Sequence, residues 1–121
     1  MDRAIAKIDR VLALRLCRGE DVMGSIHKVC EEEQINAGCI LSVVGSVQEA
    51  VFYDPRPDSS DPAGISYGDP IYVRYPAEVI SAHGEINMLE DGTRSIHIHA
   101  CFADSQGNVK AGHLIGEGNK A

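Results

Sequence analysis

The sequence has few aromatic residues and no tryptophan, with four Tyr and two Phe among 121 residues. Its core must therefore rest mainly on Val, Ile, Leu and Ala. It also lacks any run of about 18 apolar residues, which excludes a membrane-spanning helix. Residues 1–7 have no long apolar stretch after their charges, so we expect no signal peptide.

Positive charge is scarce as well. The chain has 11 Lys and Arg against 18 Asp and Glu, a net charge of −7, and its basic residues form no run. An acidic chain is repelled by phosphate backbones unless its cations gather on one face. The charge balance therefore disfavours DNA as a partner of this chain alone but leaves it open.

Cysteine pairs at metal-binding or redox spacing are absent too. Cys17, Cys30, Cys39 and Cys101 form no C-x-x-C pair, which excludes a zinc ribbon and a thioredoxin-like motif. Each stands among apolar residues, a pattern typical of reduced core cysteines in a cytoplasmic protein.

The length suits one domain, and we predict a single domain over residues 1–121. Hydrophobic periodicity predicts an α+β fold. Alternating leucines predict a half-buried strand over residues 11–16, and apolar residues three and four apart predict a helix over residues 21–34. A continuous apolar run predicts a buried strand over residues 39–44, followed by another over residues 47–53.

The next segment, residues 54–76, holds all five prolines and three of the four tyrosines. We expect a long loop there, serving as a flap or as a contact with a neighbouring subunit. Strands are predicted over residues 78–86, 95–103 and 109–115, with Ile80 on the buried side of the first.

The sharpest pattern lies in the last two predicted strands. Residues two apart on a strand share a face, so Ile96 and its alternate neighbours should face the core while His97, His99 and Cys101 face the other way. A five-residue loop over residues 104–108 places His99 directly opposite His113. A slip of one residue would send His113 to the other face.

Three imidazoles in this register have the spacing of metal ligands. Directly opposed Cβ atoms lie about 4.5–5.5 Å apart, and zinc binds imidazole nitrogen at about 2.0–2.1 Å. The pattern predicts a zinc site made by His97, His99 and His113, with a fourth position open for water or a carbonyl group. The alternative is three histidines in a subunit interface or polar groove, hydrogen-bonded to backbone and water.

Other titratable residues are weaker candidates for a functional site. Cys101 shares the predicted face and could approach the site, although a small packed residue is the favoured interpretation. His83 lies on another predicted strand and could neighbour the cluster, although a surface residue is the favoured interpretation. Glu85 and Glu117 could act as general bases only if they reach the histidine face. We assign no role to His27, which belongs to the predicted helix.

Several segments, in this order, resemble the plant- and prokaryote-conserved (PPC) domain. They are LRLCRGED at residues 14–21, ILSVVGSV at residues 40–47, EVISAHGEI at residues 78–86, and the closing His-Ile-His, ADSQGNV and Gly-His-Leu segments at residues 97–114. The resemblance covers roughly residues 11–118. The ordered set is specific, whereas no single segment would be.

The resemblance implies a mainly antiparallel sheet with one principal helix packed on it, assembled as a homotrimer. It also implies a metal- and small-ligand-binding protein of unassigned activity, with His97, His99 and His113 at the positions of the family's metal ligands. In plants the domain follows AT-hooks in DNA-binding proteins. This chain has no Arg-Gly-Arg-Pro core of an AT-hook, and it ends soon after His113, where relatives continue into another strand. We therefore expect that edge strand to be lost or supplied by another subunit.

Three functional hypotheses follow. The first is a metal-dependent binding protein or enzyme that holds zinc on the three histidines. The second is a DNA-associated regulatory module. The third is an assembly scaffold in which the histidines are structural.

Overall fold

The computed structural model describes residues 2–116 and 118–121. It confirms the predicted α+β class, with one helix and a mainly antiparallel sheet in the described part of the chain. The elements are α1 (Val22–Glu32), β1 (Gly38–Ile40), β2 (Gly45–Val47), β3 (Ala50–Tyr53), β4 (Pro55–Pro57), β5 (Ile65–Tyr67), β6 (Ile71–Val73), β7 (Ala77–Met88), β8 (Arg94–Ala103) and β9 (Val109–Leu114).

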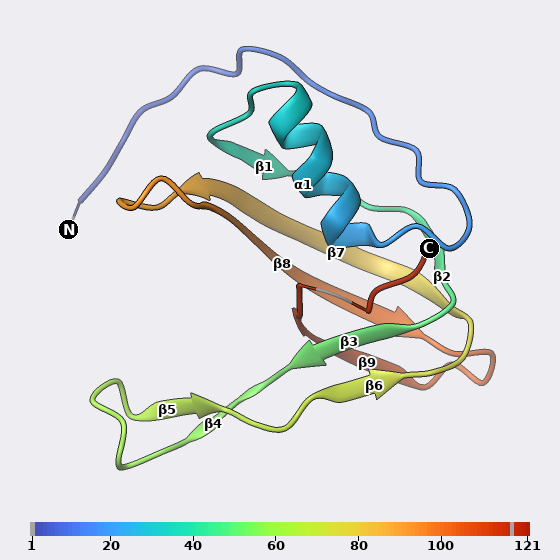
Figure 1. Ribbon diagram of the computed structural model, residues 1–121. Coiled ribbons are helices and arrows are strands. Elements are labelled where there is room, and N and C mark those ends of the chain that lie inside the picture. The colour runs from blue at the N-terminus through green and yellow to red at the C-terminus, as the bar shows by residue number, and fades with distance from the viewer. Residues whose placement is uncertain (1, 117) are drawn as a thin grey trace.

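The main sheet has the strand order β1-β7-β8-β9-β3-β6, and β2 pairs with β7 beyond β1. Every pair is antiparallel, and the long β7–β8 hairpin is its most extensive pair. Strands β4 and β5 form a separate two-stranded ribbon that projects beyond the sheet, while α1 crosses one face of the sheet (Figure 1).

Helix α1 begins where the sequence predicts. The Asp21 side chain caps it by accepting a hydrogen bond from the amide of Gly24, and the helix buries Val22, Met23 and Cys30 toward the sheet. Its last turn gives way to Gln34, whose φ is 55°. No helix among the described residues has the length and apolar character needed to cross a membrane.

The core lies between α1 and the sheet. Alternate residues of β8 supply much of it, as predicted, with Ile98 only 1% exposed. The Phe102 ring stacks on Phe52 of β3, with ring centroids 6.2 Å apart. The other residues of β8, including His97 and His99, therefore lie on the face opposite α1.

Residues 11–16 do not form the predicted strand. The N-terminal segment, residues 2–16, is extended and passes over the outside of α1 (Figure 1), where Arg10 pairs with Glu33 at 2.9 Å. Leu12 and Leu14 are each 43% exposed. Alternating leucines bury one face only when a neighbouring strand completes the surface, and the described strands of this chain do not pair with this segment.

The buried strand predicted over residues 39–44 is also wrong. The structure has a short strand at the start of this range, β1, and another directly after it, β2, and both pair with β7 at the edge of the sheet. Leu41 and Val44 between them are 73% and 89% exposed. Their apolar character suits a covered strand, but an edge position in a single chain leaves them uncovered.

The proline-rich segment is more regular than the predicted loop. Residues 54–76 contain the β4–β5 ribbon and β6, and β6 pairs with β3 in the main sheet. The prolines are compatible with strand structure here because β4 belongs to a two-stranded ribbon and is an edge strand.

Strand β7 confirms the prediction over residues 78–86 except at Ile80. A register shift between Val79 and Ser81 inserts an extra residue relative to β8. Ala82 and Ile86 are buried as expected, whereas Ile80 is exposed.

The cysteines differ from the prediction of four core residues. Cys30 is buried, and burial raises the pKa of its thiol. Cys101 is half-buried, while Cys17 and Cys39 are exposed and all four are free thiols. Local apolar sequence indicated burial here, but Cys17 follows the unpaired N-terminal segment and Cys39 lies in an edge strand.

Candidate metal centre

The histidine face is built by three adjacent strands, β7, β8 and β9. His99 lies directly opposite His113 in the β8–β9 register, as the loop length predicts, and His97 precedes His99 by two residues on the same face. The structure therefore gathers the three side chains on the face away from α1.

The imidazole nitrogens of this cluster converge. His97 Nε2 lies 3.0 Å from His99 Nε2. The His113 ring stacks on His97, with centroids 4.1 Å apart, and one nitrogen from each ring lies within 4.8 Å of the others. Tetrahedral zinc with bonds of about 2.0–2.1 Å would hold two nitrogens roughly 3.3 Å apart. The three residues thus fit a shared ion with only small side-chain movements.

Electrostatics favour the form of His113 that binds metal. Burial lowers the pKa of His113, and the nearby His97 and His99 lower it further. A metal binds the neutral imidazole, so a group kept neutral releases no proton when it becomes a ligand.

Two glycines allow the strands around the cluster to approach closely. A Cβ atom at Gly112 would overlap the Phe52 ring of β3 and the carboxylate of Asp54, the residue that follows β3. It would also lie 3.0 Å from the Tyr53 carbonyl oxygen. A Cβ atom at Gly84 would overlap the backbone carbonyl of His97. Both glycines lie beside histidines of the face, so their lack of a side chain permits the strand spacing on which the cluster depends.

The family model of the Plants and Prokaryotes Conserved (PCC, also written PPC) domain matches residues 3–121 of the chain. The chain belongs to the PPC-domain family. The resemblance drawn from the sequence motifs is thereby confirmed.

Solved structures share this PPC fold. A metal-containing protein from Archaeoglobus fulgidus is 28% identical, with a TM-score of 0.73 over 89% of this chain and 69% of its own. A plant- and prokaryote-conserved protein from Pyrococcus horikoshii is 24% identical, with a TM-score of 0.81 over 99% of this chain and 78% of its own. A "Putative DNA-binding protein" from Ralstonia eutropha JMP134 is 24% identical, with a TM-score of 0.67 over 86% of this chain and 65% of its own.

A curated relative carries the same PPC-like segment within a much longer protein. The bifunctional protein GlmU of Synechococcus sp. (strain JA-3-3Ab) is 29% identical over 105 residues, which are 87% of this chain and 14% of that protein. The chain spans about one seventh of its length, so the similarity concerns this segment alone.

His83 on β7 is a neighbour of the cluster as well as a surface residue. It is exposed, but it pairs with His99 across β7 and β8, with ring centroids 6.4 Å apart. Glu85 likewise lies directly opposite His97 on the histidine face. The five-residue turn between Met88 and Arg94 sets this register and could have placed both residues beside the cluster from the sequence.

Tyr67 is the residue that sequence reasoning missed. Its phenol oxygen lies 3.5 Å from His113 Nδ1, and its ring meets the imidazole edge-on with centroids 5.5 Å apart. Cys101 shares the histidine face but pairs with Ser81 and Ala111, outside the three-histidine group. Glu117 lies outside the described residues.

Proposed function

We propose that this PPC-domain protein binds one zinc ion through His97, His99 and His113 and offers its open coordination position to a small ligand. The observation that carries the proposal is the convergence of three imidazole nitrogens within 4.8 Å on an open face. Three imidazoles and an open position are a zinc donor set in which the metal acts as a Lewis acid toward an oxygen or nitrogen ligand. The metal-containing A. fulgidus relative lends further support.

The first prediction concerns metal content. Protein purified without added metal and then titrated with zinc should bind about one ion per chain. Replacing any one of His97, His99 or His113 by Asn should weaken zinc binding by more than the roughly 10–100-fold typical of losing an outer partner of a ligand, because two imidazoles remain in a site that needs three. Elemental analysis and competition with a chelator measure both quantities.

Two matched controls sharpen this experiment. His27→Asn removes an imidazole from α1, and His83→Asn removes the exposed neighbour of His99; neither belongs to the group of three. Both should keep zinc affinity within a few-fold of the parent. Less than about a tenth of an ion per chain, with no uptake on titration, would exclude this zinc site.

We also propose that the chain assembles as a homotrimer. The support is an uncovered N-terminal segment in which Leu12 and Leu14 remain exposed. Five of the eleven basic residues fall within residues 3–18, while sixteen of the eighteen acidic residues follow residue 18. A basic, apolar segment and an acidic body are complementary between copies of the chain.

A DNA-associated role is the second candidate. It is supported by the name of the R. eutropha protein of the same fold and by the basic residues of the N-terminal segment. The net charge of −7 opposes it. Binding to a labelled DNA duplex that weakens as salt rises would support this role. Absence of binding at low salt would remove it.

A further inference from the structure

We propose that Tyr67 is a positioning residue for the three-histidine centre. Its phenol oxygen accepts a hydrogen bond from the Nδ1–H group of His113, and this bond holds the β4–β5 ribbon against the site. The inference rests on the proposed zinc-binding function and adds a residue, and an element, that the three ligands do not include.

The contact joins two separate parts of the fold. Tyr67 ends β5 in the two-stranded β4–β5 ribbon, whereas His113 lies in β9 of the main sheet. Besides the 3.5 Å approach of Tyr67 Oη to His113 Nδ1, the ring planes meet at 76°. An edge-to-face arrangement of this kind is favourable between aromatic rings.

The chemistry of imidazole gives the contact its role. A neutral histidine that binds a metal through one ring nitrogen carries its proton on the other, and this N–H needs an acceptor. With the proton on Nδ1, His113 can donate to Tyr67 and keeps Nε2 as the unprotonated nitrogen available to a metal. Such an outer partner fixes the ring orientation, and its loss typically lowers metal affinity about 10–100-fold.

Tyr67 is itself held in place by its surroundings. The Tyr53 ring packs on it, with centroids 6.0 Å apart, and Tyr53 lies directly opposite His113 across β3 and β9. Tyr67 pairs with Pro55 in the ribbon, and the next amide, of Gly68, donates to the Asp54 carbonyl oxygen at 3.1 Å. A locked tyrosine can orient its neighbour, whereas a free one could not.

Zinc binding should also affect how often the β4–β5 ribbon opens. If zinc fixes His113 and His113 fixes Tyr67, zinc binding should reduce opening of the β4–β5 ribbon. A ligand that binds only the closed form stabilises that form, by an amount that rises with the logarithm of ligand concentration above Kd. Zinc should therefore slow amide exchange in residues 65–68 of the parent protein.

The test compares Tyr67→Phe with Tyr53→Phe. Tyr67 is 53% exposed, so removing its hydroxyl leaves the core intact. We expect Tyr67→Phe to bind one zinc about 10-fold more weakly in chelator competition and to lose the zinc-dependent slowing of exchange in residues 65–68. Tyr53→Phe keeps both rings and the Tyr67 hydroxyl. Its zinc affinity and its zinc-dependent slowing of exchange should both stay within about twofold of the parent.

The outcomes separate this inference from the proposed function. Parent-like zinc affinity and exchange in Tyr67→Phe would overturn the role of Tyr67 and leave the zinc site standing. A parent protein that binds no zinc would overturn both. Because the chain has no Trp, a tyrosinate absorption difference on adding zinc would come from the four tyrosines. Its loss in Tyr67→Phe alone would show that the phenol binds zinc directly and would overturn the positioning role.

Discussion

At the scale of single residues, the candidate site depends on glycine, which has no side chain, as well as on the histidines. Gly84 faces the backbone of His97 and Ile98 so closely that a Cβ atom would overlap the His97 carbonyl oxygen. Since that contact is with backbone, neither a rotamer change nor a flexible side chain could relieve it. The β7–β8 pairing beside His97 therefore requires glycine at this position.

Gly84→Ala should consequently destabilise the protein and disturb the site together. We expect a loss of about 1–3 kcal/mol in the free energy of unfolding, typical of overpacking, and weaker zinc binding because His97 must move with its strand. Gly38→Ala is the matched control, since Gly38 also lies in a strand paired with β7 and a Cβ atom there would meet only ordinary contacts, the nearest at 3.7 Å. Urea denaturation and chelator competition measure the two effects. Equal stability of both variants would contradict the argument.

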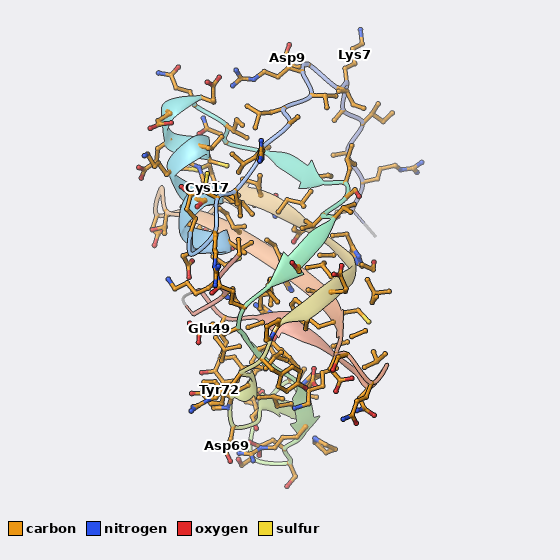
Figure 2. All side chains as sticks on the ribbon, turned by 90° about the vertical axis from the view of Figure 1, so that its right-hand side faces the viewer. Lys7, Asp9, Cys17, Glu49, Asp69 and Tyr72 are labelled. Carbon is orange, nitrogen blue, oxygen red and sulfur yellow. The ribbon has the colours of Figure 1, made fainter. Side chains whose placement is uncertain are left out.

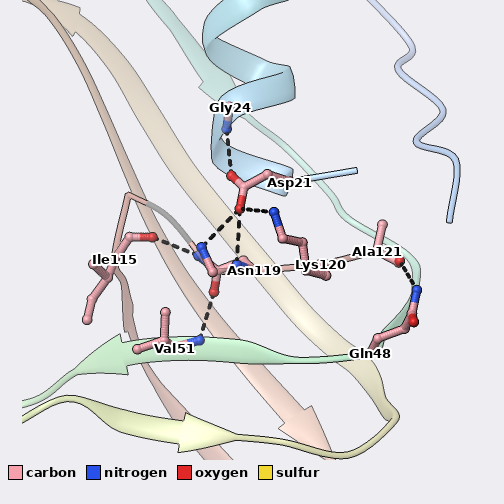
Figure 3. Close-up of polar contacts among 9 residues, drawn as sticks. Asp21, Gly24, Gln48, Val51, Ile115, Asn119, Lys120 and Ala121 are labelled. Carbon is pink, nitrogen blue, oxygen red and sulfur yellow. Dashed lines mark hydrogen bonds and ion pairs between the residues drawn. The ribbon is translucent and has the colours of Figure 1, made fainter. Parts of the chain in front are cut away.

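At the scale of elements, one carboxylate joins the start of α1 to the end of the chain. Asp21 accepts hydrogen bonds from the amides of Gly24 at 2.9 Å and Gly118 at 3.0 Å, and pairs with Lys120 at 3.4 Å (Figure 3). Asn119, only 1% exposed, accepts from the amide of Val51 in β3. Residues 118–121 are thus tied to the start of α1 and to β3 by isolated β-bridges and side-chain contacts.

Asp21 should make this closure sensitive to acid. Burial by itself raises the pKa of Asp21, but the amides of Gly24 and Gly118 and the charge of Lys120 outweigh it, so the pKa lies below its ordinary value. Ionised Asp21 therefore stabilises the folded state above the unfolded pKa of about 3.9, and this contribution is lost as the pH falls through the lower folded value.

The corresponding prediction uses the pH dependence of two variants. At pH 7 we expect Asp21→Asn to lower the free energy of unfolding by about 1 kcal/mol, because Asn keeps the helix cap but lacks the charge, and Asp21→Ala by about 1–2 kcal/mol. The deficit of Asp21→Asn should shrink once the pH falls below about 4. Urea denaturation across this range provides the measurement, with the exposed Asp9→Asn as control. A deficit that stays constant with pH would argue against the ionised carboxylate as its source.

At the scale of the whole molecule, the N-terminal segment is one part whose apolar side chains a single chain leaves uncovered. Lys7 and Asp9 project from it away from the sheet (Figure 2), and Ile5 and Ile8 are 97% and 81% exposed. An extended apolar segment without a strand partner is a surface that association can bury.

Disruption of this segment should affect assembly more than folding. We expect the parent protein to be a trimer by size-exclusion chromatography with light scattering, and the double variant Leu12→Asp, Leu14→Asp to be monomeric. Both leucines are partly exposed in the single chain, so the variant should keep the circular dichroism spectrum of the parent and unfold cooperatively. Leu89→Asp, in the exposed turn after β7, serves as control. A trimeric double variant would exclude this segment as the contact.

The amino-acid sequence by itself determined the features that depend on neighbouring residues. The alternation in β8 specifies which side chains enter the core, and the loop over residues 104–108 specifies that His99 meets His113, because strand period and hairpin length are local properties. The Asp21 cap and the helix that follows are local in the same sense. These features were sufficient to bring the three histidines together.

Only the tertiary structure decided which segments acquired partners. Residues 11–16 and 39–44 have the composition of covered strands, yet the first is unpaired and the second lies at the sheet edge. Tyr67 reaches His113 across 46 residues because β5 folds back beside β4. Apolar composition expresses a tendency to be buried, but burial requires a facing surface, and that surface comes from residues distant in the chain.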